Sequence, residues 1–127
     1  MKTNTLATRL LTLVAAIAAV FGLTVTLTGC SSQTVDMSTV TAVIDVRTPE
    51  EFATGHLDGA ININWQDPTF ADQVSALDKD GVYIIYCRSG NRAGQAIDAM
   101  TSMGFSNLTN AGGVDNASTV TGIEIVQ

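Results

Sequence analysis

The segment Val82–Tyr86 constrains the fold most strongly, because it is a nearly continuous apolar run of strand-forming residues. Such a run is typical of a central strand in a parallel sheet, which is covered on both faces. The helical pattern that follows begins at Arg92 or Ala93 and ends at Gly104. A buried strand that leads directly into a helix places Cys87 at the carboxyl end of the strand, where ligands collect in parallel sheets.

Strand and helix patterns alternate along the rest of this part of the chain. Further strands are predicted over residues 40–46, 60–63 and 105–108, and a further helix over residues 67–77. A short helix is predicted to begin at Thr48-Pro49-Glu50-Glu51, in which Thr48 and Glu51 are spaced as a capping box. This alternation with short loops predicts an α/β domain with a mainly parallel sheet.

The first thirty residues show the pattern of an export signal. Lys2 and Arg9 precede an uncharged apolar run, Leu10–Leu27. Leu27-Thr28-Gly29-Cys30 resembles the lipobox of bacterial lipoproteins, which implies that Cys30 becomes a lipidated N-terminus in the cell membrane or periplasm. The alternative is an uncleaved anchor helix, which would also leave the domain exported and tethered. The predicted segments are a lipoprotein signal peptide (1–29), a polar tether (30–36) and a folded domain (37–127).

The charged residues argue against nucleic acid as a partner. The formal net charge is −6, and Lys2 and Arg9 are two of only six basic residues, whereas all twelve Asp and Glu residues follow the signal. Binding to a phosphate backbone needs clustered Lys and Arg, and an acidic domain repels anions as a whole. An anion site must therefore be built locally, and Arg88 and Arg92 lie close together after Cys87.

The loop that begins at Cys87 carries the candidate chemistry. It joins a strand to a helix, so several backbone N–H groups and the helix dipole converge on one point. Arg88 and Arg92 add positive charge and Gly90 allows a tight turn, so we expect the pKa of the thiol to be lowered. The alternative, an inert buried thiol, is disfavoured by the two arginines. Lipidation of Cys30 would leave Cys87 without a disulfide partner in the chain.

Two stretches of the chain resemble one known family. Cys87-Arg88-Ser89-Gly90-Asn91-Arg92 resembles the active-site loop of rhodanese-domain sulfurtransferases. Asp45-Val46-Arg47-Thr48-Pro49-Glu50-Glu51-Phe52 through Gly55-His56-Leu57-Asp58-Gly59-Ala60-Ile61-Asn62-Ile63 is similar to the N-terminal signature of the same family. The resemblance covers about Met37 to the C-terminus. It implies the rhodanese-like fold, a central parallel five-stranded sheet with helices on both faces.

The resemblance also implies roles for individual residues. Cys87 is the catalytic residue, and it carries sulfur as a persulfide between an anionic donor such as thiosulfate and a thiophilic acceptor such as cyanide or a thiol. The implied substrate-binding residues are the rest of the loop, Arg88, Ser89, Gly90, Asn91 and Arg92, and the implied structural residues near the site are Asp45, Arg47 and His56. We expect no cofactor and no metal ion, and a monomer suffices for a site built on one surface loop.

Two features disfavour alternative chemistry, and one residue departs from the family pattern. The loop has the spacing C-x4-R from Cys87 to Arg92, whereas cysteine-dependent phosphatases and arsenate reductases use C-x5-R, so their chemistry is disfavoured. His56 is not expected to act as a general base, because an ionised thiolate needs none. Ala117 stands where rhodaneses often carry Trp, which weakens the expected packing of the last helix. The alternative function is non-catalytic, a sulfane-sulfur carrier or redox-sensing module that acts on a partner protein.

Overall fold

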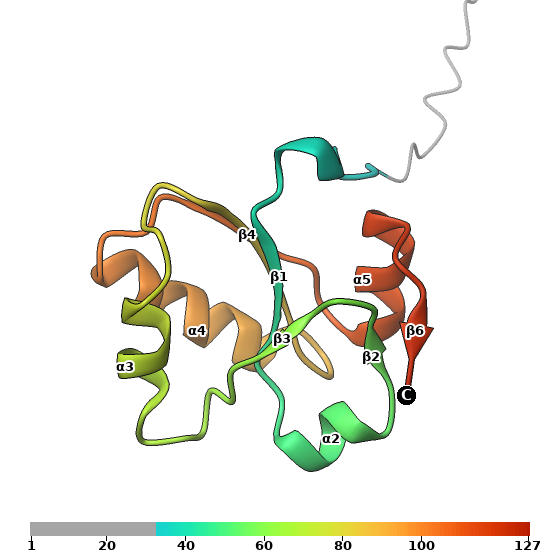
Figure 1. Cartoon of the computed structure of the whole chain (residues 1–127), viewed down its shortest axis with the longest axis horizontal. Coiled ribbons are helices and arrows are strands. Elements are labelled where there is room, and N and C mark those ends of the chain that lie inside the picture. Colours follow the sequence, from blue (N-terminus) through green and yellow to red (C-terminus); the bar gives the residue numbers. More distant parts are fainter. Residues whose placement is uncertain (1–32) are drawn as a thin grey trace, which may run out of the picture. The chain divides into compact units, whose positions relative to one another are not determined.

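A parallel sheet runs through the centre of the part of the chain that the computed structural model describes, residues 33–127 (Figure 1). The predictions for the signal peptide (1–29) and for lipidation of Cys30 lie outside these residues. The parallel strands lie in the order β3-β1-β4-β5, so the apolar run of β4 is internal, as predicted. The strands are β1 (Ala42–Asp45), β3 (Ile61–Asn62), β4 (Val82–Tyr86) and β5 (Asn107–Asn110).

The sheet has four parallel strands rather than the five that the family resemblance implied. Two further short strands, β2 (His56–Leu57) and β6 (Ile125–Val126), form a separate antiparallel pair. The C-terminal strand β6 forms its hydrogen bonds with β2, and it therefore does not extend the main sheet as a fifth strand. The α/β class is thus confirmed and the strand count is corrected.

After a first 3₁₀ turn that precedes β1, helices follow most of the strands, as the alternating pattern predicts. They are η1 (Met37–Thr39, a 3₁₀ turn), α2 (Pro49–Ala53), α3 (Phe70–Ser75), α4 (Asn91–Ser102) and α5 (Val114–Thr121). The capping box of α2 is present, because Glu51 N–H donates to Thr48 Oγ1 at 3.2 Å and Thr48 N–H donates to Glu51 Oε2 at 3.0 Å. Within the described residues, no helix has the length and apolar character needed to cross a membrane.

The last strand of the main sheet begins later than the sequence predicts. Phe105 was expected to open it, but Phe105 is buried and its N–H donates to the carbonyl of Met100 in α4. Gly104 has a positive φ of 101°, which turns the chain after the helix and directs Phe105 into the core. Phe105 therefore binds a carbonyl at the C-terminal end of α4 through its N–H, and the strand starts at Asn107.

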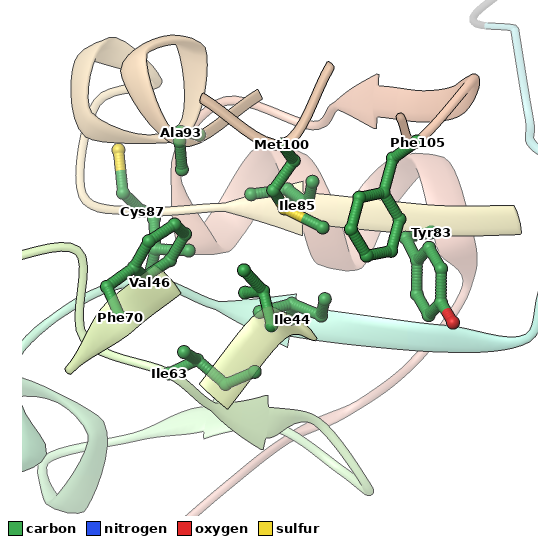
Figure 2. Close-up of a cluster of buried hydrophobic side chains, with 12 residues drawn as sticks. Ile44, Val46, Ile63, Phe70, Tyr83, Ile85, Cys87, Ala93, Met100 and Phe105 are labelled. Atoms are coloured by element: carbon green, nitrogen blue, oxygen red, sulfur yellow. The ribbon is translucent and has the colours of Figure 1, made fainter. Parts of the chain in front are cut away.

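Apolar side chains pack on both faces of the sheet. On one face, residues such as Ile44 and Ile85 cluster with residues of α3 and α4 (Figure 2). On the other face, their neighbours Val43 and Ile84 cluster with Ala117 of α5. Successive residues of a strand point to opposite faces, so β1 and β4 are covered on both sides and the predicted two-sided arrangement is confirmed. Ala117 is fully buried, so the last helix packs on the sheet through an alanine where the family often has Trp.

Candidate active site

Cys87 lies directly after β4 and before α4, where the chain turns sharply. Gly90 makes this turn with a φ of 95°, a conformation that favours glycine, and α4 begins at Asn91. Figure 2 shows the sulfur of Cys87 pointing toward the start of α4, on the side of Ala93. The N–H of Gly90 donates to Cys87 Sγ at 2.9 Å. The strand–loop–helix junction therefore directs backbone N–H groups at the thiol, as the sequence predicts.

The pKa of Cys87 is lowered from its ordinary value. Burial of the thiol is the largest single influence and acts in the opposite direction, because Cys87 has no exposed surface. Hydrogen bonds from the backbone N–H groups of Ala93, Ser89, Gly90 and Arg92 together outweigh burial. The thiolate is therefore stabilised mainly by the peptide backbone of the loop.

The two arginines of the loop have different environments. Arg92 Nη1 and Nη2 donate to the two carboxylate oxygens of Glu51 in α2, at 2.7 and 2.8 Å. This paired hydrogen bond raises the pKa of Arg92 and lowers that of Glu51 to about 2. Arg88 is exposed and forms no ion pair with any residue of 33–127. The sequence predicts two positive charges near the thiol. Among the described residues only the charge of Arg88 has no ion-pair partner, because Glu51 neutralises the charge of Arg92.

The remaining loop residues face the surface. Ser89 and Asn91 are exposed, and Gly90 is partly buried between them. The side chain of Asn91 accepts a hydrogen bond from Gln95 Nε2 one helical turn later, at 2.7 Å. Ser89 contributes its backbone N–H toward the thiol of Cys87. The exposed side chains of Ser89 and Asn91 thus form no hydrogen bond with the sulfur, which is contacted by backbone N–H groups of the loop.

Asp45 and Arg47 form a buried pair at the end of β1. Arg47 donates from Nε and Nη2 to the carboxylate of Asp45, at 2.6 to 3.0 Å, and its backbone N–H donates to the same carboxylate at 2.9 Å. Arg47 Nη2 also donates to the carbonyl of Gly55 at 2.7 Å. The pair therefore ties the end of the first strand to the turn between α2 and β2.

His56 lies in β2 and contacts α2. Its Nδ1 is 2.9 Å from the carbonyl oxygen of Phe52, and its ring stacks on the ring of Phe52 with centroids 3.6 Å apart. Both contacts hold the turn that follows the helix. His56 thus contacts both the backbone carbonyl and the aromatic ring of Phe52.

Sequence patterns did not identify several residues that the structure brings to the loop. Glu51 was recognised only as a capping residue, although its carboxylate also binds Arg92. Gly112 accepts a hydrogen bond from the N–H of Cys87 at 3.0 Å, and Gly113 lies so close to the loop that a Cβ there would be 2.6 Å from the carbonyl oxygen of Arg88. The paired glycines were the only available signal, because a glycine pair often marks a close approach of two backbones.

Fold and loop together define a class of protein. It is an α/β domain that presents a cysteine of lowered pKa, surrounded by backbone N–H groups, at the carboxyl end of a central parallel strand. No group of three or more His, Cys, Asp or Glu side chains within residues 33–127 is arranged to hold a metal ion. Residues 32–117 match the Rhodanese-like domain family, and the chain belongs to this family.

Proteins similar to this chain include two thiosulfate sulfurtransferases. The chain is 37% identical over 71 residues to Thiosulfate sulfurtransferase PspE of Escherichia coli strain K12, a match that covers 56% of this chain and 68% of that protein. It is 33% identical over 66 residues to Thiosulfate sulfurtransferase GlpE of Pseudomonas aeruginosa strain LESB58, covering 52% of this chain and 58% of GlpE. A solved structure described as a rhodanese with anions from E. coli has a TM-score of 0.56 and 33% identity, and the match covers 68% of this chain and 96% of that one. These similarities support a rhodanese-like transferase.

Proposed function

We propose that this protein transfers sulfane sulfur from thiosulfate, or a similar anionic donor, to a thiophilic acceptor through a persulfide on Cys87. The observation that carries the proposal is the hydrogen bond of 2.9 Å from Gly90 N–H to Cys87 Sγ, in a loop whose N–H groups lower the pKa of the thiol. A thiolate is the nucleophile that attacks sulfur, and the same N–H groups suit the outer sulfur anion of a persulfide. The names of the relatives support thiosulfate as the donor.

The reaction has two steps that balance in atoms and electrons. The Cys87 thiolate attacks the outer sulfur of thiosulfate, the sulfur–sulfur bond of the donor breaks, and sulfite leaves with the bonding electron pair. The product is Cys87–S–S⁻. The acceptor, such as cyanide, then attacks the terminal sulfur of the persulfide. The persulfide sulfur–sulfur bond breaks, thiocyanate leaves, and the thiolate of Cys87 is regenerated. No general base is needed, because the nucleophile is already ionised.

We assign Arg88 as the residue whose positive charge binds the anionic sulfur donor. Arg92 is held on both Nη atoms by Glu51, whereas Arg88 is exposed and has no ion-pair partner among the described residues. The solved rhodanese structure with anions supports anion binding by a protein of this kind. Because Cys87 has no exposed surface, we expect the loop to open locally when the donor reaches the sulfur.

The decisive experiment measures thiocyanate release from thiosulfate and cyanide, together with the mass of the protein after thiosulfate treatment. The wild-type protein should gain one sulfur and turn over, and Cys87→Ser should do neither while it keeps its circular dichroism spectrum. Arg88→Ala should raise KM for thiosulfate, whereas Lys79→Ala, which removes an equal charge from an exposed position near Gly104, should not. Turnover that survives in Cys87→Ser would refute the proposal. A protein that gains sulfur without turnover would instead be the non-catalytic carrier.

We further propose that the domain is exported and anchored through Cys30. The support is the sequence alone, namely the basic start, the apolar run and the ending Leu27-Thr28-Gly29-Cys30. Globomycin, which blocks the lipoprotein signal peptidase, should cause the unprocessed precursor to accumulate in producing cells. Processing that continues unchanged under globomycin would exclude the lipoprotein interpretation.

A further inference from the structure

A closed ring of four hydrogen bonds connects the cysteine loop to the end of β5. Cys87 N–H donates to the carbonyl of Gly112 at 3.0 Å, and Gly112 N–H donates to Asn110 Oδ1 at 2.9 Å. Asn110 Nδ2 donates to the carbonyl of Gly90 at 2.9 Å, and Gly90 N–H donates to Cys87 Sγ at 2.9 Å. The ring therefore starts and ends on the cysteine that the proposed function uses.

Asn110 is the only side chain in this ring besides the cysteine. It is the last residue of β5 and pairs in register with Ile85 of the central strand, so its backbone position is set by the sheet. Its amide must donate and accept at the same time to contact both segments. An aspartate lacks the donor and an alkyl side chain lacks both groups, so an amide of this length meets the requirement.

The two segments that Asn110 bridges approach each other closely. A Cβ on Gly90 would lie 3.2 Å from the Cα of Gly112, and a Cβ on Gly113 would lie 2.6 Å from the carbonyl oxygen of Arg88. Backbone thus packs on backbone, with little space for an alternative arrangement. Under these conditions a bridging side chain selects the orientation of the Gly90 segment, whose N–H points at the sulfur.

We infer that Asn110 is a positioning residue, which holds the Gly90 segment so that its N–H stabilises the thiolate and the persulfide anion of Cys87. The inference rests on the proposed function, because a stabilised sulfur anion matters only if sulfur chemistry takes place there. The hydrogen bonds of the Asn110 side chain go to the backbone of Gly90 and Gly112 and not to the sulfur. Asn110 acts on the reaction through the Gly90 peptide. Substitution of Asn110 should therefore change the pKa of Cys87 as well as the rate of sulfur transfer.

The experiment compares two variants of Asn110 with a matched control. Asn110→Ala removes both hydrogen bonds, and Asn110→Ser keeps a polar group that is too short to bridge both segments. Asn107→Ala is the control, because Asn107 opens the same strand and its amide contacts the carbonyl of Asp80 at the opposite end. For each protein, the rate of Cys87 alkylation by iodoacetamide is measured against pH, and thiocyanate release is measured beside it.

The expected result is a higher alkylation midpoint for both Asn110 variants, with alkylation at pH 7 slower by about 3- to 10-fold, because a hydrogen bond to the charged form is weakened. The rate of thiocyanate release by the Asn110 variants should also fall. Asn107→Ala should match the wild-type protein in both assays. Folded Asn110 variants that keep the midpoint and turnover of Asn107→Ala would overturn the inference while the proposed function stands. A wild-type cysteine that ionises like free cysteine and takes up no sulfur would instead overturn the proposed function.

Discussion

The ion pair between Glu51 and Arg92 offers a sharp test of how α2 is held against the cysteine loop. We consider Glu51→Gln, because glutamine has the same shape and can still complete the capping box with Thr48. The substitution removes the negative charge that the two Nη atoms of Arg92 bind at 2.7 and 2.8 Å. A loss of stability larger than that from neutralising an exposed carboxylate in the same helical turn therefore reports the ion pair rather than the capping box.

The size of the loss follows from the pKa of Glu51. Hydrogen bonds from Arg92 are the main cause that lowers this pKa from 4.5 to about 2. At about 1.4 kcal/mol for each pKa unit, the full shift from 4.5 to about 2 corresponds to an upper limit of roughly 3 to 4 kcal/mol. The side chains of Arg92 and Glu51 are 21% and 30% exposed, so water screens the pair. We therefore expect Glu51→Gln to lower the free energy of unfolding by about 1 to 1.5 kcal/mol.

The stability that the Glu51–Arg92 ion pair contributes should decrease as the pH falls. The folded-state pKa of Glu51 lies below the unfolded-state value, so the stabilisation from the ion pair is fully present above about pH 4.5 and is lost as the pH falls toward 2. Urea unfolding of the wild-type protein and of Glu51→Gln should therefore differ at pH 7 and converge in acid. For a domain of this size, the loss corresponds to a Tm lower by roughly 5 to 10 °C.

Glu50→Gln is the matched control for this experiment. Glu50 lies in the same first turn of α2, is exposed, and forms no ion pair with the described residues. It should change stability by less than about 0.5 kcal/mol. If the two variants unfold at the same urea concentration at pH 7, the ion pair contributes no stability and the reasoning is refuted.

Three further predictions concern the loop and the core. Alkylation of wild-type Cys87 should rise with pH to a midpoint below about 8.5, the value of an unperturbed cysteine, and a midpoint at or above it would contradict the lowered pKa. Gly113→Ala should cost about 1 to 3 kcal/mol in urea unfolding, because its Cβ would meet the carbonyl oxygen of Arg88, whereas Gly94→Ala, in α4 with ordinary contacts, should be neutral or stabilising. Met100→Ala, at a fully buried position, should cost about 2 to 5 kcal/mol, and a loss below 1 kcal/mol would show that the core repacks around the cavity.

Most of the fold and the centre of the site could be predicted from the sequence, because their signals are local. A continuous apolar run followed by a helical pattern places β4, Cys87 and α4 in order, and the structure agrees. The capping box at Thr48 works within one turn of helix, so its residues are neighbours in any fold that contains that helix. The first N–H groups of a helix lack intrahelical partners and point out of its N-terminus, so the lowered pKa of a thiol placed just before α4 was predictable.

The tertiary structure alone decided which distant segments meet. Glu51 binds Arg92 across 41 positions of the chain, and Asn110 binds Gly90 across 20. The pairing of β2 with β6 likewise joins residues that share no local pattern. A side chain with two possible roles, such as Glu51 as a cap and as an ion-pair partner, shows only the local role in its sequence context. The second role depends on free energies of packing and hydrogen bonding that exist only after the sheet has brought the segments together.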